Sequence, residues 1–537
     1  MMRGLFTAAT GMRGRALSGF TLCLAVPPEF EVIGSSGYYG RARGEKAEFL
    51  ASGPERLRRR GKDVLLYTVR ATRPLPYRPK VRILELLNVF VRYRGPVRPA
   101  AEYTFEYWTE AEDGSITECP QTFPVRVTPA LRGRQPKRLV LQLWGSFFGP
   151  MDDPAMKEAT LDTMRAVGFN NLVSGNREDT ELARKYGITN TMGINFEPWC
   201  LSRADYLKAH PDDALLDAKG QRSTKYVCTT ALLGHGWDDV AQALRRRIEA
   251  NRPHIVDWDY ESSPFTSYLS CYCPRCMAAF REHAGIAADM ALSPKSIRET
   301  HAAPWIDFLT TRNAQLARKF RDVANACGAR FSMYSGYESE ETHRVYGVDW
   351  RKIGRLGAAD HVGCGYGRSK ERIDASVAAL GRIPLVVGVL MRPYDRSLRE
   401  RVVPLTKARL LRRLADSTGG ILVYDRLPLG GRSWLALAEV SRLAADHEAL
   451  FLHGTAAPEL ATVEGAAEPD LAVKRLGKAA LVLLMNASRK PRTMTVRFDA
   501  AVKSATRYYA AAAAKPADPL AVHLAPGEAE AIVLTLQ

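Results

Sequence analysis

The chain has no long apolar run. None of the uninterrupted apolar stretches among its 537 residues reaches the roughly 18 residues that a membrane-spanning helix needs. The longest candidates, such as Ala479–Met485, have the length of buried strands. Nine unevenly spaced cysteines are too few for a disulfide scaffold. With 46% hydrophobic and 25% charged residues, we expect a globular chain of roughly three domains without a membrane segment.

Acidic residues are fewer than basic residues in this chain. The chain has 76 Lys and Arg against 58 Asp and Glu, a net charge of +18. A basic surface can attract nucleic acid, anionic lipid or acidic polysaccharide. No nucleic-acid-binding signature accompanies the charge. The excess is therefore interpreted as the bias of an arginine-rich proteome, and neither nucleic acid nor a membrane is expected as a partner.

The N-terminus is basic and low in regular patterning. Arg13 and Arg15 precede the apolar stretch Ala16–Val26, which has the length of the apolar part of a signal peptide. Pro27-Pro28 follows, without a small-x-small cleavage site. This favours an over-extended start or a flexible tail and slightly favours the cytoplasm, with a secreted or periplasmic location left open. We predict an irregular basic segment over residues 1–60.

Three folded domains are predicted after that segment. Strand-like runs and the turn at Asp113-Gly114 predict a β-sandwich-like domain over residues 61–136, and residues 453–537 are predicted to form a C-terminal β-sandwich. Between them, residues 137–452 alternate short apolar runs with helical stretches, which predicts a central (β/α)8 TIM barrel. The alternative, a doubly wound open sheet, lacks a G-x-G-x-x-G after its first strand. The eight expected strands are Leu139–Trp144, Asn171–Ser174, Ile188–Phe196, His254–Glu261, Arg330–Tyr334, His361–Cys364, Leu385–Met391 and Ile421–Tyr424.

The fourth expected strand carries a row of acidic residues. Side chains alternate along a strand, so Asp257, Asp259 and Glu261 share one face, and apolar residues occupy the other. The apolar face should meet the helices, which would place the carboxylates inside the barrel. Like charges held together raise at least one pKa, as a general acid requires. We expect a catalytic site here; the alternative is a solvated or ion-paired acidic cluster.

A C-x-C-x2-C cluster follows this strand. Cys271, Cys273 and Cys276 present three thiols over a tight turn, a set that suits tetrahedral zinc. Cys228 is the expected fourth ligand, with Cys200 as a substitute. Four thiolates leave no open position, so the zinc would be structural, and no organic cofactor is expected. The alternative is a group of free or oxidised cysteines.

The segment from Glu261 through Cys271-Tyr272-Cys273-Pro274-Arg275-Cys276 resembles the region after the acid/base strand of family-42 β-galactosidases. That resemblance covers roughly residues 220–285 and implies a cysteine-rich zinc cluster with a ligand one helix upstream, where Cys228 stands. That family carries Asn-Glu at the end of strand four and a nucleophilic Glu at the end of strand seven. This chain instead has Asp257-Trp258-Asp259-Tyr260-Glu261, and residues 389–395 contain no Glu. The D-x-D-x-E spacing is similar to that of family-18 chitinase-like enzymes, in which the last Glu is the acid and the middle Asp orients the acetamido group of the substrate.

Other strand ends offer further candidates. Asp395 is the candidate nucleophile if a covalent intermediate forms. Tyrosines could contact the sugar or steady an oxocarbenium ion, tryptophan could stack on a sugar face, and Arg392 could pair with an acidic substrate or tether Asp395. Each tyrosine taken alone is more often a packing residue than a catalytic one, and a tryptophan could equally serve packing. The candidate substrate-binding residues are Trp144, Tyr334, Glu338, Tyr366, Arg392, Tyr394, Tyr424 and Asp425.

These features predict a glycoside hydrolase that cleaves O-glycosidic bonds in an oligo- or polysaccharide. Glu261 is expected to donate the proton, Asp259 to orient the substrate or act as partner carboxylate, and Asp257 to hold Asp259. The first alternative is a non-catalytic carbohydrate-binding protein, favoured by the missing Glu on strand seven. A zinc-dependent nucleic-acid binder is a second, weaker alternative. A homo-oligomer is possible.

Overall fold

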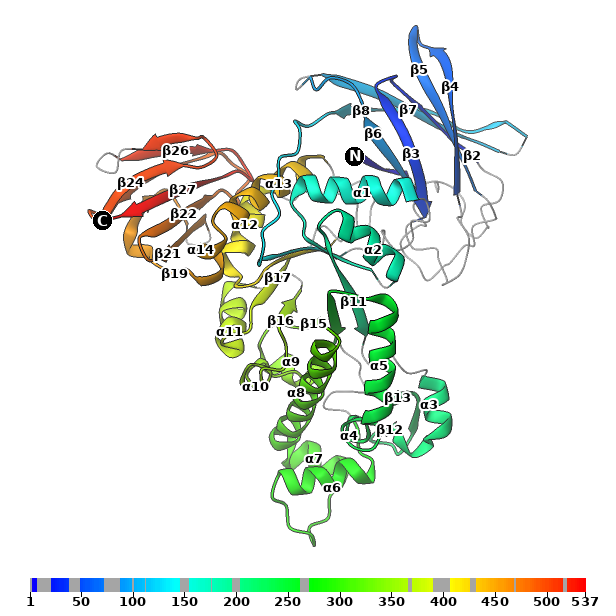
Figure 1. Cartoon of the computed structure of the whole chain (residues 1–537), viewed down its shortest axis with the longest axis vertical. Coiled ribbons are helices and arrows are strands. Elements are labelled where there is room, and N and C mark those ends of the chain that lie inside the picture. The colour runs from blue at the N-terminus through cyan, green and yellow to red at the C-terminus, as the bar shows by residue number, and fades with distance from the viewer. Residues whose placement is uncertain are drawn as a thin grey trace.

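The computed structural model describes residues 2–6, 21–37, 49–71, 87–98, 101–111, 113–144, 154–174, 176–195, 203–260, 270–365, 369–389, 406–424, 431–467, 470–514 and 519–537. At its centre lies a closed barrel of eight parallel strands flanked by helices (Figure 1). This confirms the expected TIM barrel with antiparallel sheets on either side. Six barrel strands fall within the ranges expected from the sequence, while β15 and β18 each extend one residue beyond theirs. The barrel strands are β9 (Val140–Trp144), β10 (Asn171–Val173), β11 (Thr189–Asn195), β14 (Ile255–Asp259), β15 (Arg330–Ser335), β16 (His361–Cys364), β17 (Leu385–Val389) and β18 (Gly420–Tyr424).

Helices connect successive barrel strands, as right-handed β-α units require. Two connections are enlarged: the one after β11 contains a small hairpin, β12 (Ala214–Leu216) with β13 (Arg222–Val227), and the one after β14 carries the cysteine motif. Among the described helices, none is long and apolar enough to cross a membrane. The helices are α1 (Pro154–Val167), α2 (Arg177–Lys185), α3 (Arg203–Ala209), α4 (Thr229–Leu233), α5 (Trp237–Asn251), α6 (Pro274–His283), α7 (Pro294–Thr300), α8 (Ala302–Ala326), α9 (Glu340–Tyr346), α10 (Trp350–Leu356), α11 (Lys370–Leu380), α12 (Lys407–Asp416), α13 (Gly431–Asp446) and α14 (Glu448–His453).

Two antiparallel sheets precede the barrel and enclose a core of their own, to which Leu24, Phe30, Val69 and Val91 contribute. One sheet has the order β1-β6-β3 and the other β4-β5-β2-β7-β8. Their strands are β1 (Met2–Phe6), β2 (Thr21–Val26), β3 (Phe30–Gly37), β4 (Phe49–Arg59), β5 (Lys62–Ala71), β6 (Leu87–Tyr93), β7 (Glu102–Glu110) and β8 (Ile116–Arg126).

The prediction that residues 1–60 are irregular is wrong where the structure describes them, because β1, β2, β3 and β4 fall in this range. The strand β2 is buried and pairs with both β5 and β7, so this part of the apolar stretch belongs to the folded N-terminal sheets. The edge strand β4 was not predicted from the sequence, because its sequence is charged and contains Gly53-Pro54. Edge strands tolerate charge and proline, since one side makes no ladder hydrogen bonds.

The C-terminal region forms a six-stranded sheet, β19-β21-β22-β27-β24-β25, packed on a three-stranded sheet, β20-β23-β26. Helix α12 lies against the outer face of the larger sheet, where Leu410 and Leu414 share one core cluster with Leu481 and Leu483 (Figure 1). The strands are β19 (Thr455–Ala456), β20 (Ala461–Glu464), β21 (Leu471–Leu476), β22 (Ala479–Met485), β23 (Arg492–Phe498), β24 (Val502–Arg507), β25 (Ala512–Ala514), β26 (Leu520–Leu524) and β27 (Ala529–Leu536).

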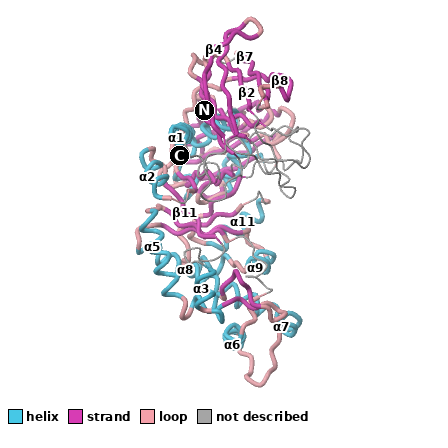
Figure 2. Tube along the Cα trace, turned by 90° about the vertical axis from the view of Figure 1, so that its right-hand side faces the viewer, coloured by secondary structure: helices cyan, strands magenta, loops and turns pink. Residues whose placement is uncertain are grey.

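The cysteine-bearing segment is set apart from these sheets. Figure 2 shows α6 and α7 at one end of the molecule and strands β4, β7 and β8 at the other, with the barrel between them. This segment has a hydrophobic cluster of its own, in which the buried cysteines pack with Phe280, Trp305 and Phe308. The ring of Tyr272 stacks on Trp305 with 5.2 Å between centroids. Helix α8 therefore serves two cores, its first turns packing here and its later turns on the barrel.

Candidate functional site

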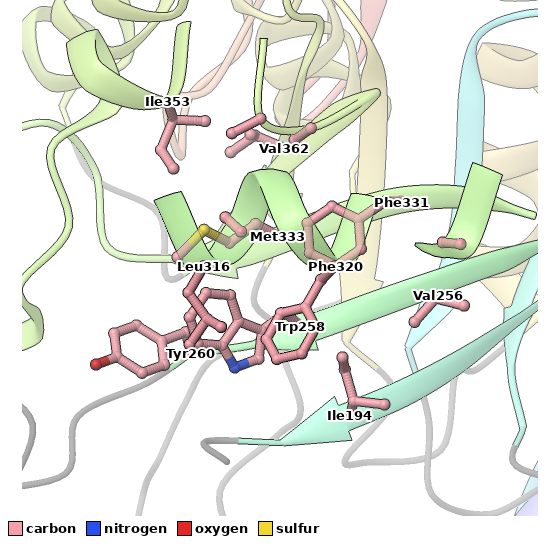
Figure 3. Close-up of a cluster of buried hydrophobic side chains, with 14 of the residues drawn as sticks. Ile194, Val256, Trp258, Tyr260, Leu316, Phe320, Phe331, Met333, Ile353 and Val362 are labelled. Atoms are coloured by element: carbon pink, nitrogen blue, oxygen red, sulfur yellow. The ribbon is translucent and has the colours of Figure 1, made fainter. Parts of the chain in front are cut away.

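The strand β14 places its acidic and apolar residues on opposite faces, as the alternation predicts. Val256, Trp258 and Tyr260 belong to the cluster in which α8 packs on the barrel, and Figure 3 shows Trp258 and Tyr260 beside Leu316 and Phe320. The ring centroids of Trp258 and Phe320 lie 5.2 Å apart. Because this face meets the helices, Asp257 and Asp259 point to the barrel interior.

Asp257 is a buried carboxyl group, with 3% of its surface exposed. It accepts a hydrogen bond from the hydroxyl of Ser332, its neighbour on β15, while its Oδ2 has no hydrogen-bond partner among the described residues. Burial raises the pKa of Asp257 to about 7, and the Ser332 hydrogen bond opposes part of that rise. Asp257 can therefore exchange a proton near neutral pH.

Aromatic side chains gather at the C-terminal ends of the barrel strands. Tyr334 lies near the end of β15 and pairs in register with Asp259 of β14. Tyr424 of β18 pairs in register with Trp144 of β9. The Trp144 centroid lies 5.2 Å from that of Tyr334 and 5.9 Å from that of Tyr424. We call Trp144, Tyr334 and Tyr424 the aromatic floor. Three of the expected substrate-binding residues thus lie together, and one of them, Tyr334, pairs in register with Asp259.

The chain makes room for Tyr334 with glycine. A Cβ atom at Gly365, after β16, would overlap the Tyr334 hydroxyl, and a Cβ at Gly363 would lie 3.0 Å from Tyr334 Cδ2. Because Tyr334 is only 1% exposed, it has little freedom to move aside. Gly363 on β16 and Gly365 after it therefore leave the space that the Tyr334 ring occupies.

Glu338 lies in a different environment from the aromatic floor. Its Oε1 accepts from His343 Nε2 at 2.9 Å, and its Oε2 accepts from the backbone N–H of Trp350 at 3.2 Å. The Glu338 hydrogen bond raises the pKa of His343. Glu338, His343 and Asp349 bring ligand atoms within 4.8 Å of one another, but Asp349 also caps α10 by accepting from Arg351 N–H at 2.9 Å. These contacts suit a loop-bracing network, and the substrate-binding role of Glu338 stays a prediction.

The four expected cysteines come together. The Sγ atoms of Cys228, Cys271, Cys273 and Cys276 all lie within 4.8 Å of one another, and all four residues are buried. Cys228 Sγ is 3.3 Å from Cys276 Sγ and 3.6 Å from Cys273 Sγ, and none is in a disulfide. Four thiolates around a tetrahedral ion with bonds of about 2.3 Å would be about 3.8 Å apart. The donor set and its spacing are consistent with a metal site.

Hydrogen bonds among the four thiols give them different pKa values. Those from Cys271 and Cys273 hold the pKa of Cys228 well below the usual thiol value, while the Cys228 thiolate raises the pKa of Cys276. Other polar groups also contact sulfur: Leu216 N–H donates to Cys271 Sγ at 3.2 Å, and the Thr230 hydroxyl shares a hydrogen bond of 3.0 Å with Cys276 Sγ, in which either group can donate. A hydrogen bond donated to sulfur stabilises a thiolate more than a thiol.

Two partners of this cluster were missed by sequence reasoning. Arg312 of α8 donates through Nη1 to Cys276 Sγ at 3.4 Å. Asp213, buried before β12, receives Arg275 at 2.6 Å, His235 at 2.8 Å and the Tyr206 hydroxyl at 2.7 Å. Arg275 lies inside the cysteine motif, which was a usable signal. Arg312 lies 36 residues beyond Cys276, and no local pattern marks it.

Several expected site residues fall outside the described part of the chain, so their predicted roles stay predictions. They are Glu261, Tyr366, Arg392, Tyr394, Asp395, Asp425 and the substitute ligand Cys200.

Comparisons with known proteins bear on the fold. No family model matches the chain, and no curated protein matches it in sequence. Among solved structures, Gan42B, a GH42 β-galactosidase, aligns with a TM-score of 0.51 at 9% identity over 75% of this chain and 100% of that one. Its catalytic mutant from G. stearothermophilus gives 0.50 at 8% identity over 75% and 100%. A maltogenic α-amylase from Thermotoga neapolitana gives 0.46 at 10% over 74% and 99%. The two Gan42B alignments show that the chain has a fold similar to that of a TIM-barrel glycoside hydrolase.

Proposed function

We propose that this protein is a glycoside hydrolase that cleaves O-glycosidic bonds in an oligo- or polysaccharide. One observation carries the proposal: Asp257 and Asp259 face the barrel interior beside the aromatic floor, and Asp257 has a pKa near neutrality. Aromatic faces bind the apolar faces of sugars, while carboxyl groups in differing environments supply an acid and its partner. The fold shared with glycosidases is consistent with this activity.

The proposed roles follow the order of residues along β14. Glu261, two residues beyond Asp259, would protonate the leaving oxygen. Asp259 would orient the substrate or act as the partner carboxylate, and Asp257, deeper in the barrel, would hold Asp259. Asp395 would be the nucleophile of a covalent intermediate. Without a second carboxylate facing Glu261, an acetamido group of the substrate would take that part.

Hydrolysis of a panel of aryl glycosides tests the proposal. Wild type should release the aryl group from at least one sugar, Glu261→Gln should lose about 10²-fold or more in kcat, and Asp259→Asn should also lose activity. Asp322→Asn, which removes an exposed carboxylate of α8, is the matched control. Equal background rates for wild type and Glu261→Gln on every sugar would refute hydrolysis.

A non-catalytic carbohydrate-binding protein is the second candidate. It is favoured by β17, which reads LVVGV and carries no carboxylate, and by the absence of Glu over residues 389–395. It predicts sugar-dependent quenching of tryptophan fluorescence that Trp144→Ala abolishes, together with background hydrolysis.

We further propose that the four cysteines bind zinc. A buried all-thiolate set suits zinc, and four protein ligands leave no open position for a substrate. Zinc would therefore stabilise the enlarged connection after β14 rather than take part in hydrolysis. Elemental analysis should find about one zinc per chain; less than half an equivalent, with freely titrating thiols, would refute the site.

A further inference from the structure

Arg312 is an unusual residue to find in a hydrophobic cluster. It lies on α8 with only 6% of its surface exposed, and its guanidinium carbon is 4.6 Å from the centroid of the Phe308 ring. A buried guanidinium keeps its charge, so it needs an anion nearby. Among the described residues, no carboxylate pairs with Arg312.

The anion that the structure offers is sulfur. Arg312 Nη1 donates to Cys276 Sγ at 3.4 Å. A neutral thiol is a poor partner for a buried cation, whereas a thiolate held by a metal satisfies it.

The turn of α8 that carries Arg312 is also fixed independently of sulfur. Asn313, the next residue, donates to the backbone oxygen of Gly347 at 2.8 Å and to the Tyr260 hydroxyl at 3.3 Å. These bonds hold this turn of α8 between the end of β14 and the loop before α10. The backbone of Arg312 is therefore held by contacts other than those to sulfur, and its guanidinium lies over the Phe308 ring.

We propose that Arg312 is the charge-compensating residue of the four-thiolate zinc centre, and that it slows loss of the metal. Zinc with four thiolates carries a net charge of −2, and burying that charge without a cation is unfavourable. Arg312 offsets half of it and donates a hydrogen bond to one ligand. Residues that touch metal ligands in this way commonly change metal affinity 10- to 100-fold. The inference rests on the proposed zinc centre and is independent of glycosidase activity.

The test follows zinc transfer from purified full-length protein to a chromophoric chelator in excess. Arg312→Met keeps an apolar stem of similar length and removes the charge, while Arg312→Lys keeps the charge. Arg318→Met is the matched control, because Arg318 lies on the same helix, is 46% exposed and pairs with Asp322. The first-order rate of zinc loss and the zinc content per chain are measured for each.

We expect Arg312→Met to lose zinc 10- to 100-fold faster than wild type, Arg312→Lys to stay within about threefold, and Arg318→Met to match wild type. If the Met variant does not fold by circular dichroism, Arg312→Gln, which keeps a donor without the charge, should show the same acceleration. Equal rates for wild type and the neutral variants would overturn the proposal, as would a Lys variant as fast as the Met variant. Wild type without zinc would refute the centre itself, whereas zinc-loaded protein with no glycosidase activity would leave this inference intact.

Discussion

Replacing Asp257 with Asn should make the stability of the barrel less dependent on pH. In the folded chain burial raises the pKa of this carboxyl to about 7, against 3.8 for an unperturbed aspartate. The unfolded chain therefore releases this proton at lower pH than the folded chain. As pH rises from about 4 to about 7, the free energy of unfolding falls, and above pH 7 it levels off.

The magnitude follows from the two pKa values. Each tenfold difference in acid strength corresponds to about 1.4 kcal/mol, so the full penalty at high pH is about 4 kcal/mol. Between pH 5 and pH 8 wild type should lose roughly 2–3 kcal/mol through this group. Asn cannot ionise, so the unfolding free energy of the variant does not fall with pH through this group. Its buried amide N–H has no acceptor among the described residues, however, and this lowers stability by about 1–3 kcal/mol at every pH.

Chemical denaturation followed by tryptophan fluorescence at pH 5 and pH 8 measures the effect. On going from pH 5 to pH 8, the unfolding free energy of Asp257→Asn should rise by roughly 2–3 kcal/mol relative to that of wild type. Asp322→Asn, which removes an exposed carboxylate, should follow wild type. If the variant and wild type differ in unfolding free energy by the same amount at both pH values, the raised pKa of Asp257 is refuted.

Three further perturbations have defined outcomes. Ser332→Ala removes the hydrogen bond that lowers the Asp257 pKa, so the fall in stability should move to higher pH in the same denaturation series. Cys276→Ser should lower zinc content well below that of wild type and speed tryptic cleavage after Arg281 of α6 and Lys295 of α7, whereas Cys327→Ser, outside the cluster, should leave both unchanged; equal zinc in the two variants would contradict the site. Gly365→Ala should displace Tyr334 from Trp144 and lower stability by about 1–3 kcal/mol, seen as a lower denaturation midpoint; an unchanged midpoint and fluorescence spectrum would show that the aromatic floor tolerates a side chain there.

The barrel could be predicted because its signals are local. Each barrel strand is a short apolar run followed by a helical stretch, and the alternation along Asp257-Trp258-Asp259 survives folding since opposite faces of β14 meet opposite environments. The thiol set was predictable because three of its members lie within six residues.

The features that were missed depend on distant contacts. The strand β4 contains Glu55, Arg56 and Arg58, and this charged sequence predicts a loop. It forms a strand because it pairs with β5. Arg312 looks like an ordinary polar position of a long helix, and only the packing of α8 on the cysteine segment turns it inward. The Ser332–Asp257 contact joins neighbouring strands that are 75 residues apart in sequence.

The contact of α12 with the larger C-terminal sheet limits how this chain can be divided. Leu410, Leu411 and Leu414 are shielded on one side by Leu481, Leu483 and Ala531, so the barrel does not close its own outer surface. A shortened chain that stops at the end of α14 would leave this helix with an uncovered apolar stripe, prone to self-association. Recombinant fragments meant to isolate the barrel should therefore retain residues 454–537.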